Sequence, residues 1–232
     1  MTRKFNPSKL ILIILIPILI LLISFQMNAF DTNYYHKQFE KNNVYNEFTI
    51  NKTQLHQVNV ELLDYLQVGQ GEVNITYPKT IKPFFNQKET QHLVEVKEII
   101  QGLSILFYFF LTIFIILTFI LYFKNNNNFT KNMIIILISG NVLNIISTLL
   151  LSWTMFTNFS KFFINFHLAL FESDTWLLNP LTDNLIKMFP KQFFYDIGFR
   201  IVSDSVIYSI VLILILYYIY RKSKITRKTN NY

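Results

Sequence analysis

Four long apolar runs dominate the pattern of hydrophobic and polar positions along the chain. They are Leu10–Phe25, Leu103–Phe123, Met133–Phe156 and Ile201–Tyr220. At about 1.5 Å per helical residue, the last three are long enough to cross a hydrocarbon core of about 30 Å, and the first reaches that length with its continuation to Phe30. The pattern therefore predicts four transmembrane helices and excludes a soluble globular protein.

The first apolar run follows a basic cluster, as the apolar core of a signal peptide does. The cluster is formed by Arg3, Lys4 and Lys9. Signal peptides end in a cleavage site of small residues, and the segment Gln26–Ala29 fits such a site poorly. We therefore predict an uncleaved membrane anchor.

Charge is distributed unevenly between the segments that flank the apolar runs. The two ends of the chain and the segment 124–131 together hold ten of the 21 Lys and Arg residues and none of the 14 acids. Since positive charge marks the cytoplasmic side of membrane proteins, both termini and this connecting segment are predicted to be cytoplasmic. The net charge of +7 is thus a signal of topology, because its basic residues lie beside membrane spans rather than among stacking aromatic residues on a nucleic-acid-binding face.

These signals divide the chain into eight consecutive segments that alternate between membrane and water. We expect an N-terminal transmembrane anchor over 1–30, an extracytoplasmic cap over 31–98, a second span over 99–124, a cytoplasmic loop over 125–132, a third span over 133–157, an outer loop over 158–200, a fourth span over 201–220 and a basic cytoplasmic tail over 221–232. The fold class is therefore an all-α membrane protein with four transmembrane helices, a small mainly α cap and a long second outer loop.

The cap segment is too short for a large core of its own. Apolar residues at helical spacing predict a helix from about Thr53 to Gln67, with Thr53 as its cap, and Val73–Tyr77 alternates like a short strand. From Thr90 onward a helical pattern runs without a strong breaker into the second span. We expect one continuous helix there, with its polar first turns above the membrane.

The third span carries polar residues that hydrocarbon does not tolerate without partners. Asn141 and Asn144 are accompanied by Ser139, Gly140 and Ser147. Small and amide side chains commonly hold membrane helices together, so we expect this stripe to face another helix rather than to line a polar pathway.

The connection between the third and fourth spans is longer than a turn requires and is rich in aromatic residues. Its phenylalanines predict a short interfacial helix, and His167 follows them directly. Asn179 or Thr182 is placed to cap a second short helix over Asp183–Phe189, which Pro190 ends. The phenylalanine stripe consists of Phe159, Phe162, Phe163 and Phe166.

Two histidines are placed by this topology at the outer membrane surface, at similar depth. They are His92, before the second span, and His167, after the third. A convergent pair of imidazoles suits general acid–base chemistry near pH 7, and Glu95, Asp174 or Asp183 could orient an imidazole or stabilise its cation. The alternative is that each histidine is an ordinary interfacial residue with an apolar body and a polar edge.

Other catalytic chemistries find less support in the sequence. There is no cysteine, no GxSxG elbow and no glycine-rich phosphate loop, so covalent catalysis through a recognisable nucleophile is not indicated. Two histidines with carboxylates could bind a metal, but the HExxH motif is missing. We therefore expect neither a metal nor another cofactor.

One stretch of the outer loop carries a resemblance to a known family. The segment FHLALFESDTWLLNPLTDNLIKMFPKQFF, together with QHLVEVK before the second span, resembles the bacterial integral-membrane family of lipoprotein intramolecular transacylases. The topology covers the whole chain, whereas the motifs cover residues 91–97 and 165–196. The family usually has Asp at the position of Glu95.

The resemblance implies an acyl transfer within one substrate at the bacterial plasma membrane. The acyl chain at the sn-2 position of a diacylglyceryl-modified lipoprotein would move to the α-amino group of its own N-terminal cysteine, giving the lyso form. The two essential histidines of the family map onto His92 and His167, and the site would face outward. Asp174, Trp176 and Asp183 are candidates for shaping the loop.

An amine that attacks an ester of the same molecule needs proximity, proton transfer and a stabilised oxyanion rather than an enzyme nucleophile. The implied partners are the lipoprotein and the lipid bilayer, with no nucleic acid. The competing interpretations are a non-catalytic membrane scaffold or subunit and a metal-dependent membrane hydrolase.

Overall fold

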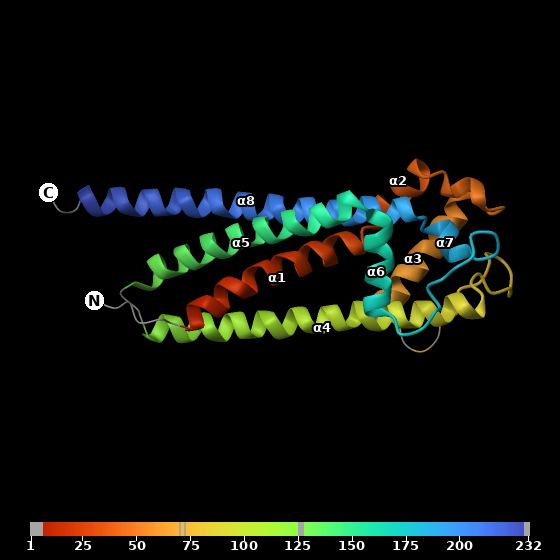
Figure 1. Ribbon diagram of the computed structural model, residues 1–232, viewed down its shortest axis with the longest axis horizontal. Helices are drawn as coiled ribbons and strands as arrows, with labels where there is room; N and C mark the ends of the chain where they lie inside the picture. The colour runs from red at the N-terminus through yellow and green to blue at the C-terminus, as the bar shows by residue number, and fades with distance from the viewer. Residues whose placement is uncertain (1–6, 70, 72, 125–127, 230–232) are drawn as a thin grey trace. The chain divides into compact units, whose positions relative to one another are not determined.

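The protein is mainly helical in the part of the chain that the structure describes. This computed structural model describes residues 7–69, 71, 73–124 and 128–229, with only the backbone for 223–229. In chain order the helices are α1 (Pro7–Ala29), α2 (Thr32–Lys41), the 3-10 helix η1 (Val44–Glu47), α3 (Lys52–Val68), α4 (Gln87–Lys124), α5 (Phe129–Thr157), α6 (Phe159–Leu170), α7 (Asn184–Met188) and α8 (Lys191–Thr229) (Figure 1).

Four of these helices are long and apolar enough to cross a membrane. They are α1, α4, α5 and the part Lys191–Lys222 of α8. The predicted fold class, an all-α membrane protein with four spans, is thereby confirmed. The prediction of one continuous helix leading into the second span is also confirmed, because α4 runs for 38 residues from its polar first turns through the apolar run.

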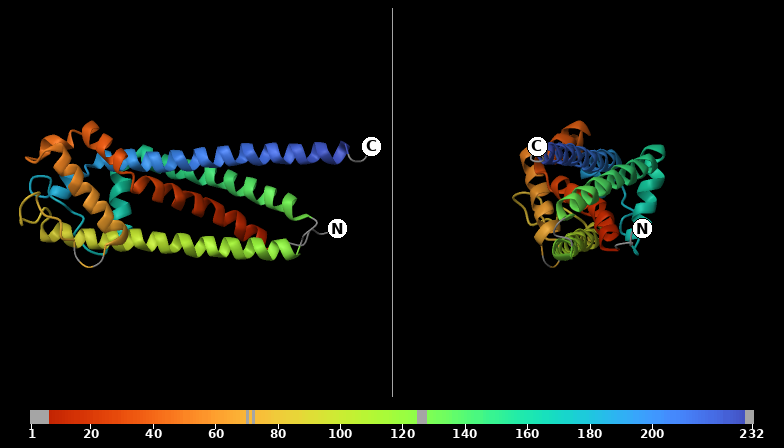
Figure 2. Two further views of the ribbon diagram at one scale, coloured as in Figure 1. Left: turned by 180° about the vertical axis from the view of Figure 1, so that it is seen from behind. Right: turned by 90° about the vertical axis from the view of Figure 1, so that its left-hand side faces the viewer.

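The chain forms two compact units. The first comprises Met1–Phe25, Leu106–Trp153 and Ile201–Tyr232, and the second comprises Gln26–Ile105 and Thr154–Arg200. In the first unit the apolar parts of α1, α4, α5 and α8 run lengthwise in one bundle (Figures 1 and 2). The second unit contains α2, α3, α6 and α7 together with the polar first turns of α4 and α8.

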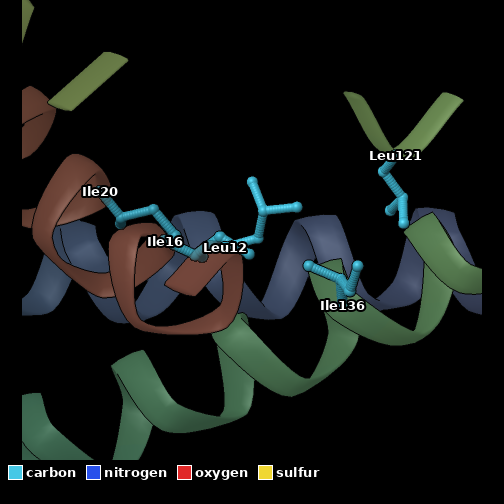
Figure 3. Packing of buried hydrophobic residues seen from close by; sticks show 5 residues of the cluster. All are labelled: Leu12, Ile16, Ile20, Leu121 and Ile136. Carbon is cyan, nitrogen blue, oxygen red and sulfur yellow. The ribbon is translucent and has the colours of Figure 1, made fainter. Parts of the chain in front are cut away.

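The core of the first unit is built around α1. Its side chains Leu12, Ile16 and Ile20 are buried and gather with Leu121 of α4 and Ile136 of α5 (Figure 3). Gly140 of α5 lets α1 approach closely, since a Cβ atom at this position would lie 2.7 Å from the Cβ of Ile16. A glycine at a helix crossing is the usual way in which membrane helices bring their backbones together.

Asn144, in the polar stripe of the third span, packs against another helix as predicted for the stripe. Ser147 is instead exposed, and the Asn141 side-chain amide donates to the Leu137 backbone oxygen of its own helix. The side-chain amide of Asn144 on α5 lies 3.2 Å from the backbone oxygen of Ser205 and 2.9 Å from the hydroxyl oxygens of both Ser205 and Ser209 on α8. All three residues are buried. Their hydrogen bonds satisfy a polar group inside an apolar bundle and fix the register between α5 and α8.

The second unit has an aromatic core. Phe39 of α2, Phe84 before α4 and Phe193 of α8 are almost completely buried, and Tyr35 of α2 packs with its ring centroid 4.9 Å from that of Phe193. The Tyr35 hydroxyl donates to the backbone oxygen of Ala29, so its polar end has a partner inside the core.

The strand predicted over Val73–Tyr77 is wrong. The structure has only one isolated bridge there, between Thr76 and Pro83, and none of the described residues lies in a strand. The bridge consists of two backbone hydrogen bonds, from the N–H of Tyr77 to the oxygen of Lys82 and from the N–H of Phe84 to the oxygen of Ile75. The chain turns directly after it, since the Tyr77 oxygen accepts from the N–H of Thr80.

Two helix caps differ from their predictions. Helix α3 begins at Lys52, and its cap is Asn51, whose side chain accepts from the backbone N–H of Gln54 while the Gln54 side chain accepts from Asn51 in return. This capping box replaces the predicted cap Thr53. Helix α7 has Asp183 at its N-cap position, instead of Asn179 or Thr182, and that side chain makes no capping hydrogen bond.

The close approach of α1 and α5 can be tested with Gly140→Ala. The added methyl group would overlap Ile16, and overpacking of this kind costs about 1–3 kcal/mol. We expect a lower unfolding temperature in detergent, measured by tryptophan fluorescence. The matched control is Gly102→Ala, whose Cβ atom would meet nothing within 4 Å, and equal unfolding temperatures of the two variants would contradict the proposed contact.

Candidate active site

The structure brings the two sequence-predicted histidines together in the second unit. His92 lies near the start of α4, before its apolar run, and His167 lies in the last turn of α6, which extends from the end of α5 towards α4 (Figure 1). Their ring centroids are 6.3 Å apart with an angle of 27° between the ring planes. Both residues are buried, each with only 7% of its surface exposed.

Aromatic rings surround the two imidazoles. The ring of Phe171 lies 4.8 Å from that of His92 and 5.4 Å from that of His167. Trp176, one of the sequence-predicted loop residues, lies 4.9 Å from His167, and Phe163 lies 4.2 Å from it. These rings displace water from both imidazoles, so the pair lies in an environment of low polarity.

His167 is anchored through its Nδ1 atom. This atom is 2.7 Å from the backbone oxygen of Phe163, one helical turn earlier. Because a carbonyl oxygen only accepts hydrogen bonds, Nδ1 must carry the proton, and in the neutral ring the lone pair is on Nε2. The contact exists because α6 includes His167 and continues to Leu170. The phenylalanine stripe had predicted a helix that His167 only follows.

His92 lies beside the carboxylate of Glu95. Its Nδ1 atom is 3.7 Å from Oε2 of Glu95 and 3.5 Å from the hydroxyl oxygen of Thr175. The same carboxylate accepts at 2.6 Å from the hydroxyl of Ser173 and at 2.6 Å from that of Thr175. Glu95 therefore meets both His92 and the loop that follows α6.

Ser173 and Thr175 were missed by sequence analysis. Both lie between predicted residues of the loop, but small hydroxyl side chains in a polar loop carry no signal of their own. Their position in the loop, three and five residues after the end of α6 at Leu170, could not be used to predict that they would meet Glu95 on another helix.

The other two predicted carboxylates do not contact the imidazoles. Asp174 is exposed. Asp183 is buried and accepts from the Asn86 side chain at 2.9 Å, from the Asn179 backbone N–H at 2.7 Å and from the Thr182 hydroxyl at 2.8 Å. Asp183 thus connects the loop to the residue that precedes α4.

Glu89 is a second connection of this kind, and sequence analysis missed it. Its carboxylate accepts from the backbone N–H groups of Asn86 at 2.7 Å and of Leu185 at 2.6 Å, so it serves the beginnings of both α4 and α7. Burial raises the pKa of this carboxyl group. The sequence did contain a signal, since Asn86 and Glu89 form the N-x-x-E pattern of a capping box.

Burial controls the protonation of both imidazoles, which lie outside the apolar runs. It lowers the pKa of His92, as does the positive charge that His167 can carry, and the Glu95 carboxylate only partly offsets these effects. Burial also lowers the pKa of His167. Both rings are therefore neutral near pH 7 and able to accept a proton.

The site does not form a recognisable metal centre. Among the described residues, no group of three or more His, Cys, Asp or Glu side chains is arranged so that it could hold a metal ion. The chemistry that this arrangement supports directly is proton transfer by the two imidazoles.

The lowered histidine pKa values predict how stability depends on pH. Below about pH 6.5, the ordinary histidine pKa, the unfolded chain takes up protons that the folded imidazoles resist until lower pH, so stability falls on acidification. We expect a lower unfolding temperature in detergent at pH 5.5 than at pH 7.5. The decrease should be smaller in the double variant His92→Gln/His167→Gln, and an equal decrease in both proteins would show that the pair does not cause it.

Comparisons with known proteins agree on one family. The family model described as lipoprotein intramolecular transacylase Lit matches residues 10–194. No significant match occurs among curated proteins.

The fold is similar to solved structures of the membrane-integral lipoprotein intramolecular transacylase Lit from Bacillus cereus. One has a TM-score of 0.79 and 23% identity over 94% of this chain and 97% of that one. A variant with a histidine-to-arginine substitution has a TM-score of 0.76 and 23% identity over 95% and 93%. A histidine-to-alanine variant has a TM-score of 0.76 and 23% identity over 94% and 94%.

The likeness to the solved structures supports a four-span, membrane-integral fold, and the family match covers most of the chain. The protein therefore belongs to the family of lipoprotein intramolecular transacylases, which are membrane acyltransferases.

Proposed function

We propose that this enzyme moves the acyl chain at the sn-2 position of a diacylglyceryl-modified lipoprotein to the α-amino group of its N-terminal cysteine, using His92 and His167 for proton transfer. The observation that carries the proposal is the pair of buried imidazoles with ring centroids 6.3 Å apart. Groups separated by this distance can serve one reacting centre, because a hydrogen bond from each spans about 3 Å.

The reaction needs no nucleophile from the enzyme. The amine nitrogen of the substrate attacks the ester carbonyl carbon, the new amide bond forms, and the bond to the glyceryl oxygen breaks. The substrate amine enters as an ammonium group and must lose two protons, while the departing oxygen must gain one. Proton acceptors and a proton donor are thus required at the same centre.

Two neutral imidazoles fit this proton balance. One takes the first ammonium proton and later gives it to the departing glyceryl oxygen, and the other takes the second proton as the amide forms. Nδ1 of His167 donates to a carbonyl oxygen, which leaves its Nε2 as an acceptor. We assign the first proton to His92, because the carboxylate of Glu95 at 3.7 Å stabilises its cationic form.

Exposed apolar side chains of α6 provide contacts for the acyl chains of the substrate. Phe166, Leu168 and Leu170 flank His167 in the sequence and are 47%, 63% and 42% exposed. Exposed apolar groups next to a polar reaction centre suit a lipid whose ester lies at the boundary between hydrocarbon and water.

The charge distribution supports a membrane orientation in which both termini are cytoplasmic and the site faces outward. In this proposal residues 31–98 form the outer cap, 158–200 form the outer loop, and 125–132 form the cytoplasmic connection between the second and third spans. The acyl transfer would then take place at the outer surface of the bacterial plasma membrane.

The proposed roles of the histidines are tested with His92→Gln and His167→Gln. Mass spectrometry of a lipoprotein N-terminus from cells that carry each variant reports the lyso form directly. Each substitution removes a proton acceptor, and since positioned acid–base groups contribute about 100-fold to 10,000-fold to rate, we expect the lyso form to fall below detection. Unchanged amounts in both variants, at equal protein levels, would overturn the assignment.

The orientation is tested with reporter fusions at two places. A fluorescent protein that folds only in the cytoplasm should give signal when fused to the C-terminal tail. A phosphatase that needs the exterior should be active when inserted after Thr80, in the proposed cap. The reverse pattern would show that the site faces the cytoplasm.

A further inference from the structure

We propose that Thr175 is a positioning residue that fixes the proton of His92 on Nδ1 and thereby keeps the lone pair on Nε2 for the substrate. Ser173 supports this arrangement by holding the other oxygen of Glu95. The inference rests on the proposed function, in which His92 acts as a base. It concerns two residues of the quoted loop segment for which the sequence predicted no role.

The hydroxyl groups of Ser173 and Thr175 carry fewer protons than they make contacts. Three short oxygen contacts join these groups: Ser173 to Oε1 of Glu95 at 2.6 Å, Thr175 to Oε2 of Glu95 at 2.6 Å, and Ser173 to Thr175 at 2.7 Å. An ionised carboxylate only accepts, so the two hydroxyl groups supply just two protons for three contacts. No hydroxyl proton is left to point towards His92.

The contact between Thr175 and His92 therefore has a direction. The hydroxyl oxygen of Thr175 lies 3.5 Å from Nδ1 of His92 and, with its proton engaged elsewhere, acts there as an acceptor. Nδ1 must then be the donor and carry the proton.

The ionised state of Glu95 agrees with this count. Burial raises the pKa of its carboxyl group, but hydrogen bonds from Ser173 and Thr175 and the nearby His92 outweigh burial and lower the pKa overall. A carboxylate that accepts from two hydroxyl groups is stabilised in its charged form. Glu95 thus holds Thr175 with its proton turned away from the imidazole.

The imidazole of His167 also carries its proton on Nδ1, but a different acceptor fixes it there. His167 donates from Nδ1 to the backbone oxygen of Phe163, whereas His92 donates through Thr175 to Glu95. Both rings consequently carry their lone pair on Nε2. A matched pair of acceptors is what the loss of two protons from one ammonium group requires.

The test uses Thr175→Val, which keeps the shape of the side chain but removes its hydroxyl group. Thr175→Ser restores the hydroxyl. The control is Thr90→Val on the same helix as His92, because the Thr90 hydroxyl donates only to the backbone oxygen of Gln87 among the contacts described. The readouts are nitrogen-15 NMR of the histidine rings in the full-length protein and the rate of lyso-lipoprotein formation.

We expect the His92 signals, assigned with His92→Gln, to show the Nδ1-protonated tautomer in the wild type, Thr175→Ser and Thr90→Val. In Thr175→Val the two tautomers should mix, and the rate should fall about fivefold to tenfold, as expected for the loss of one hydrogen bond. The His167 signals should not change.

The proposal is overturned if Thr175→Val retains the His92 tautomer, or if Thr175→Ser is impaired as much as Thr175→Val. The NMR result does not depend on activity. If His92→Gln keeps full activity, the proposed function fails, whereas the tautomer comparison still decides the role of Thr175.

Discussion

Two carboxylates on the first three turns of α4 hold the site together by accepting hydrogen bonds from a loop about eighty to one hundred residues later in the chain. Glu95 accepts from Ser173 and Thr175, and Glu89 accepts from the backbone of Leu185. Between them, on the same helix, lies His92. A carboxylate that is removed from water needs hydrogen-bond donors, and Glu89 is almost completely buried while Glu95 is partly buried. The loop and the start of α4 therefore depend on one another.

This dependence explains why the aromatic residues lie where they do. With Ser173 and Thr175 fixed to Glu95, the adjoining Phe171 and Trp176 are held against the imidazoles. The rings exclude water, and the resulting loss of solvation lowers the pKa of both histidines. One set of hydrogen bonds therefore holds the rings that shape the site and that keep its two imidazoles neutral.

The spans and the continuity of α4 could be predicted from the sequence, because apolar runs and helical periodicity are local signals of strong physical origin. Topology placed the two histidines at a similar depth, and the resemblance of the loop segment to the transacylase family then selected them as site residues. The contacts of Glu95 with Ser173 and Thr175 could not be predicted, since they join segments about eighty residues apart and involve residue types that are common in any loop.

Local errors had local causes. The expected strand is reduced to one bridge because the chain turns directly after Tyr77. The cap of α3 is Asn51 rather than Thr53, because Asn51 forms a reciprocal pair with Gln54. The phenylalanine stripe shows which face of α6 is apolar but not where the helix ends, so the helix was expected to end before His167. For this reason the hydrogen bond from His167 to the Phe163 backbone oxygen was not predicted.

The anchor of His167 has a consequence for how this site can change during evolution. Its acceptor is the backbone oxygen of Phe163, which is present whatever side chain occupies that position. Substitutions at 163 can alter the packing around the imidazole without removing its hydrogen-bond partner, provided that the helix persists. The anchor of His92 consists of side chains and can be lost by a single codon change, so the two halves of the pair differ in their tolerance of mutation.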